Sequence, residues 1–118
     1  MRYLGFDMSA PAVLYLLHHP QLAAVKVGIT GHAERIRRFE QRGWNVQHVL
    51  SFRTGAAAWT VEQAVLGRIR ADLRLSFFLT PLQTQGTGGF TETFNATQLL
   101  PADLRSIVDD EESRLNLT

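Results

Sequence analysis

Two short runs of β-forming residues lie close together near the start of the chain, and they constrain its fold more than any other feature. Residues 13–17 read Val-Leu-Tyr-Leu-Leu, an apolar run typical of a buried strand. Residues 25–30 alternate apolar side chains with other residues at the two-residue period of a strand. Residues 18–21 between them hold a proline and polar side chains and indicate a turn. The sequence therefore predicts a β-hairpin.

A third strand and three helices are predicted from the remaining periodicity. Residues 45–53 alternate again, which puts Val46, His48, Leu50 and Phe52 on one face. Helical patterns cover residues 33–42, 56–74 and 101–115. Residues 81–89 form a loop rich in glycine, threonine and glutamine, and residues 90–94 predict a short strand or an ordered strap. We expect an α/β fold of the α+β type, with a small, mainly antiparallel three-stranded sheet flanked by helices.

Length and composition indicate one domain. The 118 residues, 45% of them apolar, suffice for a single core over about residues 13–95 with a C-terminal helix at 101–115. Without cysteine, neither a disulfide framework nor a thiolate zinc site is possible, which is typical of a reducing compartment. No secretory signal and no membrane-spanning run of about 18 apolar residues is recognised. We therefore expect a cytoplasmic protein.

The charge is unevenly distributed along the chain. Residues 1–74 hold ten Lys and Arg against five Asp and Glu, a net charge of +5, whereas residues 75–118 carry −4. A basic first part is suited to attracting a polyanion such as nucleic acid. Ordinary drift of charge along a small domain would give the same pattern, so the feature alone does not decide between these readings.

Glu62 interrupts an apolar helical stripe. At about 100° per residue, Ala58, Leu66, Ile69 and Leu73 all fall within about 40° of it. A buried carboxylate is costly unless it holds a proton or meets a positive partner. One possible partner is a divalent cation, which favours carboxylate oxygens. Another is an arginine in a structural ion pair. A third reading needs no partner, because the apolar stripe could open to water at a helix end.

Lys26 is the only lysine in the chain and lies between two valines of the second strand. Strand alternation places it on the face opposite those valines. If Pro20 and Gln21 form the turn, Tyr15 pairs with Lys26 across the hairpin and their side chains share one face, about 5 Å apart. The other reading is a lysine on the solvated face of an ordinary sheet.

Arg35 borders the buried face of the following helix. Guanidinium groups bind phosphates with two hydrogen bonds, so Arg35 is the candidate for a specific role. Arg37, Arg38 and Arg42 are better explained as a solvated helix face, and no histidine is assigned a role.

Together these positions resemble the GIY-YIG nuclease superfamily, in particular a phage and bacterial branch with lysine in the second motif. Ten residues separate Tyr15 of the first motif from Lys26 of the second, which is the family spacing. The first motif keeps only its tyrosine, because Val13 and Leu14 replace glycine and isoleucine. The other matching positions are Lys26-Val27-Gly28, Gly28-Ile29-Thr30 followed by Arg35, then Glu62, and Gly89-Phe90-Thr91-Glu92-Thr93-Phe94.

The resemblance implies an endonuclease that hydrolyses DNA phosphodiester bonds with Mg²⁺ or Mn²⁺. Glu62 would hold the metal and Arg35 would bind the phosphate. Either Tyr15 takes a proton from the attacking water or Lys26 orients that water. We expect these four residues to converge on one concave surface, with Gly28, Thr30, Glu92 or Asn95 at its rim.

Two other functions remain open at this point. One is a non-catalytic nucleic-acid-binding module that retains the fold, and the other is a small interaction protein that uses the acidic C-terminal part. DNA is the expected partner, and the residues do not distinguish it from RNA or show whether a specificity partner or a second copy of the chain is required.

Overall fold

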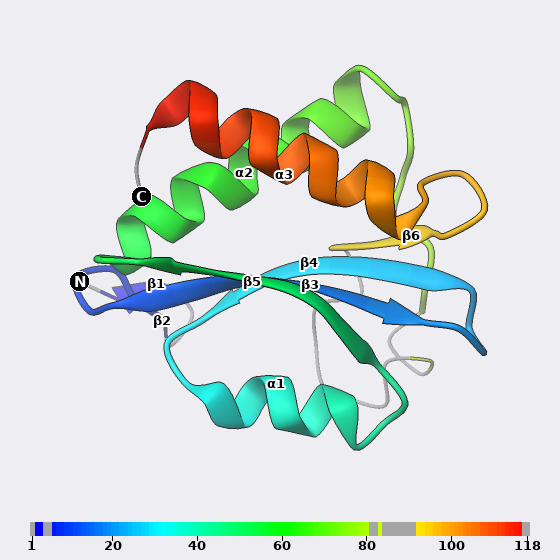
Figure 1. Cartoon of the computed structure of the whole chain (residues 1–118), viewed down its shortest axis with the longest axis horizontal. Coiled ribbons are helices and arrows are strands. Elements are labelled where there is room, and N and C mark those ends of the chain that lie inside the picture. The colour runs from blue at the N-terminus through cyan, green and yellow to red at the C-terminus, as the bar shows by residue number, and fades with distance from the viewer. Residues whose placement is uncertain (1, 4–5, 81–82, 84–91, 117–118) are drawn as a thin grey trace.

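The computed structural model describes residues 2–3, 6–80, 83 and 92–116, which form an α+β fold with an antiparallel sheet and three helices (Figure 1). The strands are β1 (Arg2–Tyr3), β2 (Phe6–Asp7), β3 (Ala12–His19), β4 (Ala24–Thr30), β5 (Asn45–Phe52) and β6 (Thr93–Asn95). The helices are α1 (Ala33–Glu40), α2 (Gly55–Ala71) and α3 (Pro101–Leu115). Strands β1 and β2 pair with each other, and the main sheet has the order β5-β3-β4-β6.

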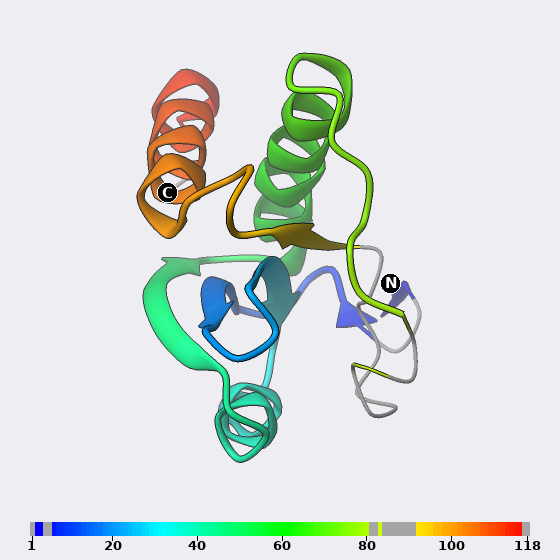
Figure 2. The ribbon, with the colours of Figure 1, turned by 90° about the vertical axis from the view of Figure 1, so that its right-hand side faces the viewer.

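The helices cover opposite faces of the main sheet. Helix α1 lies on one face, and α2 and α3 lie side by side on the other (Figures 1 and 2). Because side chains alternate along a strand, β3 contributes to both sides: Leu14 and Leu16 pack with α2 and α3, whereas Tyr15 and Leu17 pack beneath α1. Helix α3 is part of the larger core through Leu104, Ile107 and Val108, so the core extends well beyond residue 95.

The prediction of a three-stranded sheet is wrong, because β6 adds a fourth strand. It pairs antiparallel with the first three residues of β4, from Ala24 to Lys26. Three residues are too few to show a period, so the sequence indicated only a short strand or strap at 90–94. Of that stretch, Phe90 and Thr91 lie outside the described residues.

The hairpin is confirmed, but its register differs from the predicted one. Tyr15 lies opposite Gly28, and Lys26 lies opposite Leu17. The strands extend to His19 and Ala24 and leave a four-residue turn, in which the N–H of Ala23 donates to the carbonyl of Pro20 (3.2 Å). A shift of two residues preserves the side on which each side chain points. Tyr15 and Lys26 therefore share a face as diagonal neighbours.

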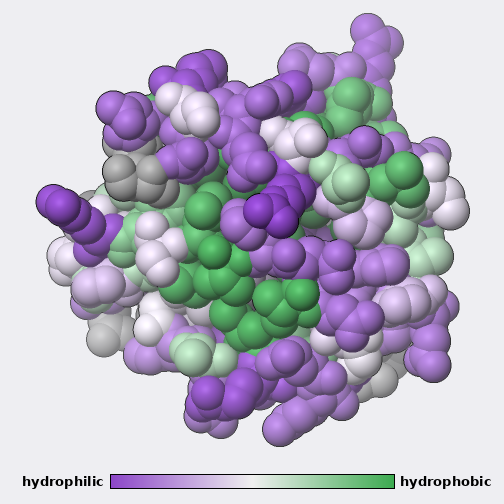
Figure 3. All heavy atoms as spheres, viewed as in Figure 1, coloured by the Kyte–Doolittle hydropathy of each residue, from purple (hydrophilic) through white to green (hydrophobic). Residues whose placement is uncertain are grey.

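Strand β5 forms one edge of the sheet and is irregular. Its pairing with β3 shifts between Leu16, opposite His48, and Leu17, opposite Val46. The extra residue at this bulge moves Val46 to the face of Leu17, so the prediction that Val46 and His48 share a face is wrong. Val46 and Val49 are exposed. Figure 3 shows the face of the molecule on which β5 lies in front, and apolar side chains gather in the middle of this face.

Two helices end earlier than the periodicity predicted. Helix α1 ends at Glu40, and the chain turns through Gly43 at a φ of +94°. Helix α2 ends at Ala71, and Arg74 adopts a left-handed conformation with φ at 56°. Leu73 is therefore outside the helix and 46% exposed instead of buried. No helix in the described part of the chain has the length and apolar character needed to cross a membrane.

The Tyr15 ring lies directly over the Cα atom of Gly28, and a Cβ atom added at Gly28 would collide with the Tyr15 hydroxyl and ring. We expect Gly28→Ala to lower the free energy of unfolding by about 1–3 kcal/mol, because the buried ring has to move. Gly67→Ala is the control, since an added Cβ there meets nothing within 4 Å and alanine favours the helix by roughly 0.5–1 kcal/mol. Urea unfolding measures both changes; equal stability of the two variants would contradict this packing.

Candidate functional site

Tyr15, Lys26 and Arg35 surround the ring of Phe39 on the α1 side of the sheet. The ring centroids of Tyr15 and Phe39 are 6.0 Å apart. The Lys26 Nζ atom and the Arg35 Cζ atom each lie 5.4 Å from the Phe39 centroid. Both cations are within the distance at which an aromatic ring attracts a positive charge. The buried Phe39 ring thus holds a phenol, an ammonium and a guanidinium together.

The turn between β4 and α1 brings Arg35 to this group. The hydroxyl of Thr30 accepts a hydrogen bond from the N–H of His32 (3.1 Å), which folds the chain sharply before the helix begins. Arg35 and Phe39 are four residues apart on α1, so they lie on the same side of the helix. Arg35 is half-buried and makes no ion pair with any described residue.

Lys26 is fully buried, and its ammonium bonds a carboxylate that is distant in sequence. The Nζ atom donates to Glu92 Oε2 at 3.0 Å. Glu92 immediately precedes β6 and is partly exposed, so pairing of β6 with β4 delivers it to Lys26. The ion pair therefore lies at the start of β6 and is reached by solvent from the Glu92 side.

Glu62 lies on the buried face of α2, as the helical stripe predicts. Its residue exposure is only 5%, and Gln63 donates a hydrogen bond to Glu62 Oε1 (3.3 Å). Within the described part of the chain, Glu62 has no ion-pair partner, so the structural ion pair with an arginine that the sequence left open is not formed there. Burial of Glu62 is thus confirmed, and a structural salt bridge does not explain it.

The environment of Glu62 favours its protonated form. Burial is the largest cause, the negative charge of Glu92 is the second, and together they raise the pKa of Glu62 to about 7. The charges of Lys26 and Arg70 lower this pKa, but to a smaller extent. Helices α1 and α2 pack on opposite faces of the sheet. The charges of Lys26 and Glu92 nevertheless act on the Glu62 carboxyl.

The four residues predicted at the rim of the site lie in different parts of the structure. Glu92 joins the site directly through Lys26. Gly28 lies beneath Tyr15, and Thr30 shapes the turn before α1. Asn95 lies at the far end of β6, where its side chain accepts bonds from the N–H and hydroxyl of Thr97 (2.9 and 2.7 Å) and stabilises a turn.

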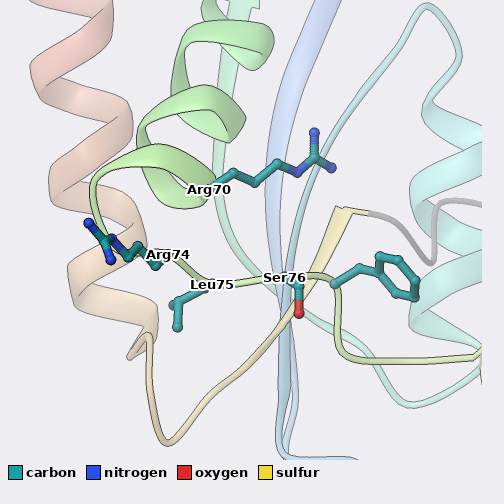
Figure 4. Close-up of a pocket in the computed structure, with 5 residues that line it drawn as sticks. Arg70, Arg74, Leu75 and Ser76 are labelled. Carbon is teal, nitrogen blue, oxygen red and sulfur yellow. The ribbon is translucent and has the colours of Figure 1, made fainter.

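Phe39 and Arg70 contribute to the site but were not selected from the sequence. Phe39 is the buried residue of α1, and Arg70 is an exposed residue near the end of α2. Arg70 lines a shallow surface cavity, open to solvent, of about 420 Å³ together with Arg74, Leu75, Ser76 and Phe77 (Figure 4). The four predicted site residues do not line this cavity. A single charge at an exposed helix position gives no sequence signal that would identify Arg70.

Comparisons with protein-family models, curated proteins and solved structures found no match to this chain. Among the residues that the structure describes, no group of three or more His, Cys, Asp and Glu side chains could together hold a metal ion. The candidate site is therefore defined by its own geometry: one buried carboxyl, one ion pair, a guanidinium and a phenol.

The pKa of Glu62 predicts how stability depends on pH. Because its pKa rises from 4.5 to about 7 on folding, the folded state binds the proton more tightly, so this group destabilises the fold as pH rises from 4.5 through 7. In EDTA, we expect Glu62→Gln to be more stable than wild type at pH 8 by roughly 3 kcal/mol, and by much less at pH 5. Glu40→Gln, an exposed control, should follow wild type. Urea unfolding at both pH values tests this; a Glu62→Gln difference independent of pH would contradict it.

Proposed function

We propose that the chain is a metal-dependent endonuclease of the GIY-YIG type that hydrolyses phosphodiester bonds in DNA. The observation that carries the proposal is the buried Glu62 carboxyl, which has no ion-pair partner among the described residues and shares its electrostatic environment with the Lys26–Glu92 pair. A carboxylate in such a place is stabilised by a multivalent cation. Arg35 and Tyr15, both beside Phe39, add the groups expected around a phosphate.

The donor set fits a magnesium or manganese ion. Mg²⁺ binds hard oxygen ligands and is commonly held by one or two carboxylates, with substrate phosphate and water completing its shell. Glu62, with Glu92 nearby, can supply such carboxylate oxygens. When bound, a divalent ion would stabilise negative charge on the phosphate and on the leaving oxygen.

Arg35 is suited to binding the scissile phosphate. Its guanidinium rests on the Phe39 ring, which restricts its orientation while leaving its N–H groups available. Two parallel hydrogen bonds to phosphate oxygens would position the substrate and stabilise the charge that develops in the transition state.

Lys26 and Tyr15 take different roles in this proposal. An ammonium group is only a donor, so Lys26, fixed by Glu92, can orient the attacking water but cannot accept its proton. A phenol oxygen can both accept and donate, and Tyr15 lies on the same side of the sheet as Lys26. We therefore assign proton transfer to Tyr15, which would accept the proton of the water while its own hydroxyl proton passes to a phosphate oxygen, and orientation of the water to Lys26.

The activity test compares nicking of supercoiled plasmid in Mg²⁺, Mn²⁺ and EDTA. We expect nicking by wild type in either metal and none in EDTA. Glu62→Gln should lose nicking by about 100-fold or more while remaining folded, because metal binding is removed. Arg35→Ala should lose a similar amount, since each phosphate donor contributes about 10²–10³ in rate. Arg38→Ala, exposed on the same helix, should nick like wild type.

Metal binding can be tested without a substrate. An ion that binds only the folded state raises the melting temperature, by an amount that grows with the logarithm of its concentration divided by its Kd. At pH 8, we expect Mn²⁺ to raise the melting temperature of wild type and Glu40→Gln, but not that of Glu62→Gln. A wild type that neither responds to Mn²⁺ nor cleaves any form of DNA would refute the nuclease proposal and favour a non-catalytic module.

A further inference from the structure

The end of α2 combines positive charge with exposed aromatic and aliphatic side chains. Arg70 lies in the last turn of the helix and Arg74 just after it, and both are exposed. Phe77 is 51% exposed, and Phe78 and Leu73 are also exposed large apolar residues. Phenylalanine is usually buried, and contiguous exposed apolar side chains often mark a binding surface.

This segment is tied to the candidate site by hydrogen bonds. The N–H of Phe78 donates to the carbonyl of Thr93 (2.9 Å), and the N–H of Leu79 donates to the Thr93 hydroxyl (3.0 Å). Thr93 lies opposite Lys26 in the sheet and follows Glu92 in the chain. The exposed aromatic segment therefore runs beside the Lys26–Glu92 pair.

Arg70 forms a second link to the site. Its charge lowers the pKa of Glu62, although Glu62 lies two turns away on α2. Figure 4 shows the Arg70 side chain extending away from α2, whereas Arg74 projects in a different direction, and Leu75 and Ser76 lie on the segment that follows Arg74. Arg70 thus both influences the pKa of Glu62 and lines the cavity that Phe77 also lines.

We propose that this cavity, the Arg70 cavity, binds an unpaired nucleotide of the DNA substrate, with the base against Phe77 and its phosphate at Arg70. The inference rests on the proposed nuclease function and adds a substrate class to it. Positive charge beside an aromatic face complements a phosphate joined to a base, and the volume of about 420 Å³ is in the range of small-ligand sites, ~300–1,000 Å³.

The aromatic residue decides between paired and unpaired DNA. Bases in a duplex are stacked on one another and do not present a free face, whereas unpaired bases stack on aromatic side chains. A duplex would need only the arginines, and Phe77 would then contribute nothing. The substrate is therefore single-stranded DNA or a junction at which single-stranded DNA meets duplex.

Fluorescence anisotropy in EDTA tests the inference separately from cleavage. The probes are a labelled single-stranded oligonucleotide, its duplex, and a strand of the same length in which all bases are replaced by abasic sites. We expect wild type to bind the intact strand more tightly than the duplex or the abasic strand. Phe77→Ala should weaken binding of the intact strand about fivefold or more and leave binding of the abasic strand unchanged.

Controls separate stacking from damage to the fold. Leu100→Ala removes another exposed apolar side chain, at the start of α3, and should bind like wild type. Phe77→Leu keeps an apolar side chain without an aromatic face and should lose affinity even if Phe77→Ala unfolds. Arg70→Gln should reduce the dependence of log K on log salt by about 0.7, the value for one phosphate contact on a single strand, whereas Arg105→Gln should not.

Equal binding of intact and abasic strands by wild type, or unchanged binding by both Phe77 variants, would overturn the inference even if metal-dependent cleavage is found. Phe77-dependent binding by a protein that responds to no metal and cleaves no DNA would support the nucleotide site and refute the nuclease proposal.

Discussion

The ion pair between Lys26 and Glu92 is the interaction on which the arrangement of the candidate site depends. Lys26 is fully buried in β4, an interior strand of the sheet, and a buried ammonium requires a nearby negative charge. Glu92 supplies that charge from the residue before β6. The ion pair therefore forms when β6 pairs with β4 as the fourth strand of the sheet.

Around that pair, the two faces of the sheet contribute different chemistry. The α1 side provides Tyr15 and Arg35, both in contact with Phe39. The α2 side provides Glu62, whose carboxyl is influenced by Glu92 and Lys26. The packed aromatic ring and the surrounding apolar side chains help to hold these polar groups in place. The proposed chemistry and the substrate contact at Arg70 both arise from this arrangement.

Features that depend on local periodicity were predictable from the sequence, whereas features that depend on distant partners were not. The 3.6-residue period placed Glu62 on the buried face of α2, and strand alternation placed Tyr15 and Lys26 on one face. Local pattern could not fix the hairpin register, because a shift of two residues preserves every face. The bulge that moves Val46, the ion pair with Glu92 and the role of Phe39 all require contacts between segments far apart in the chain.

Sequence separation also has a consequence for how the molecule folds and opens. Lys26 and Glu92 are 66 residues apart, and closing a loop of that length has an entropic cost that must be met before the contact forms. The hairpin of β3 and β4 is local, whereas the described part of β6 pairs with three residues of β4 and accepts two further hydrogen bonds from Phe78 and Leu79. We therefore expect amide hydrogens of β6 to exchange with solvent before those of β3, through openings that withdraw Phe94 from the larger core but leave β3 and β4 paired. In such openings the rest of the protein would remain folded while Lys26 and Glu92 separate. The lifetime of the paired β6 strand would therefore limit the lifetime of the assembled site.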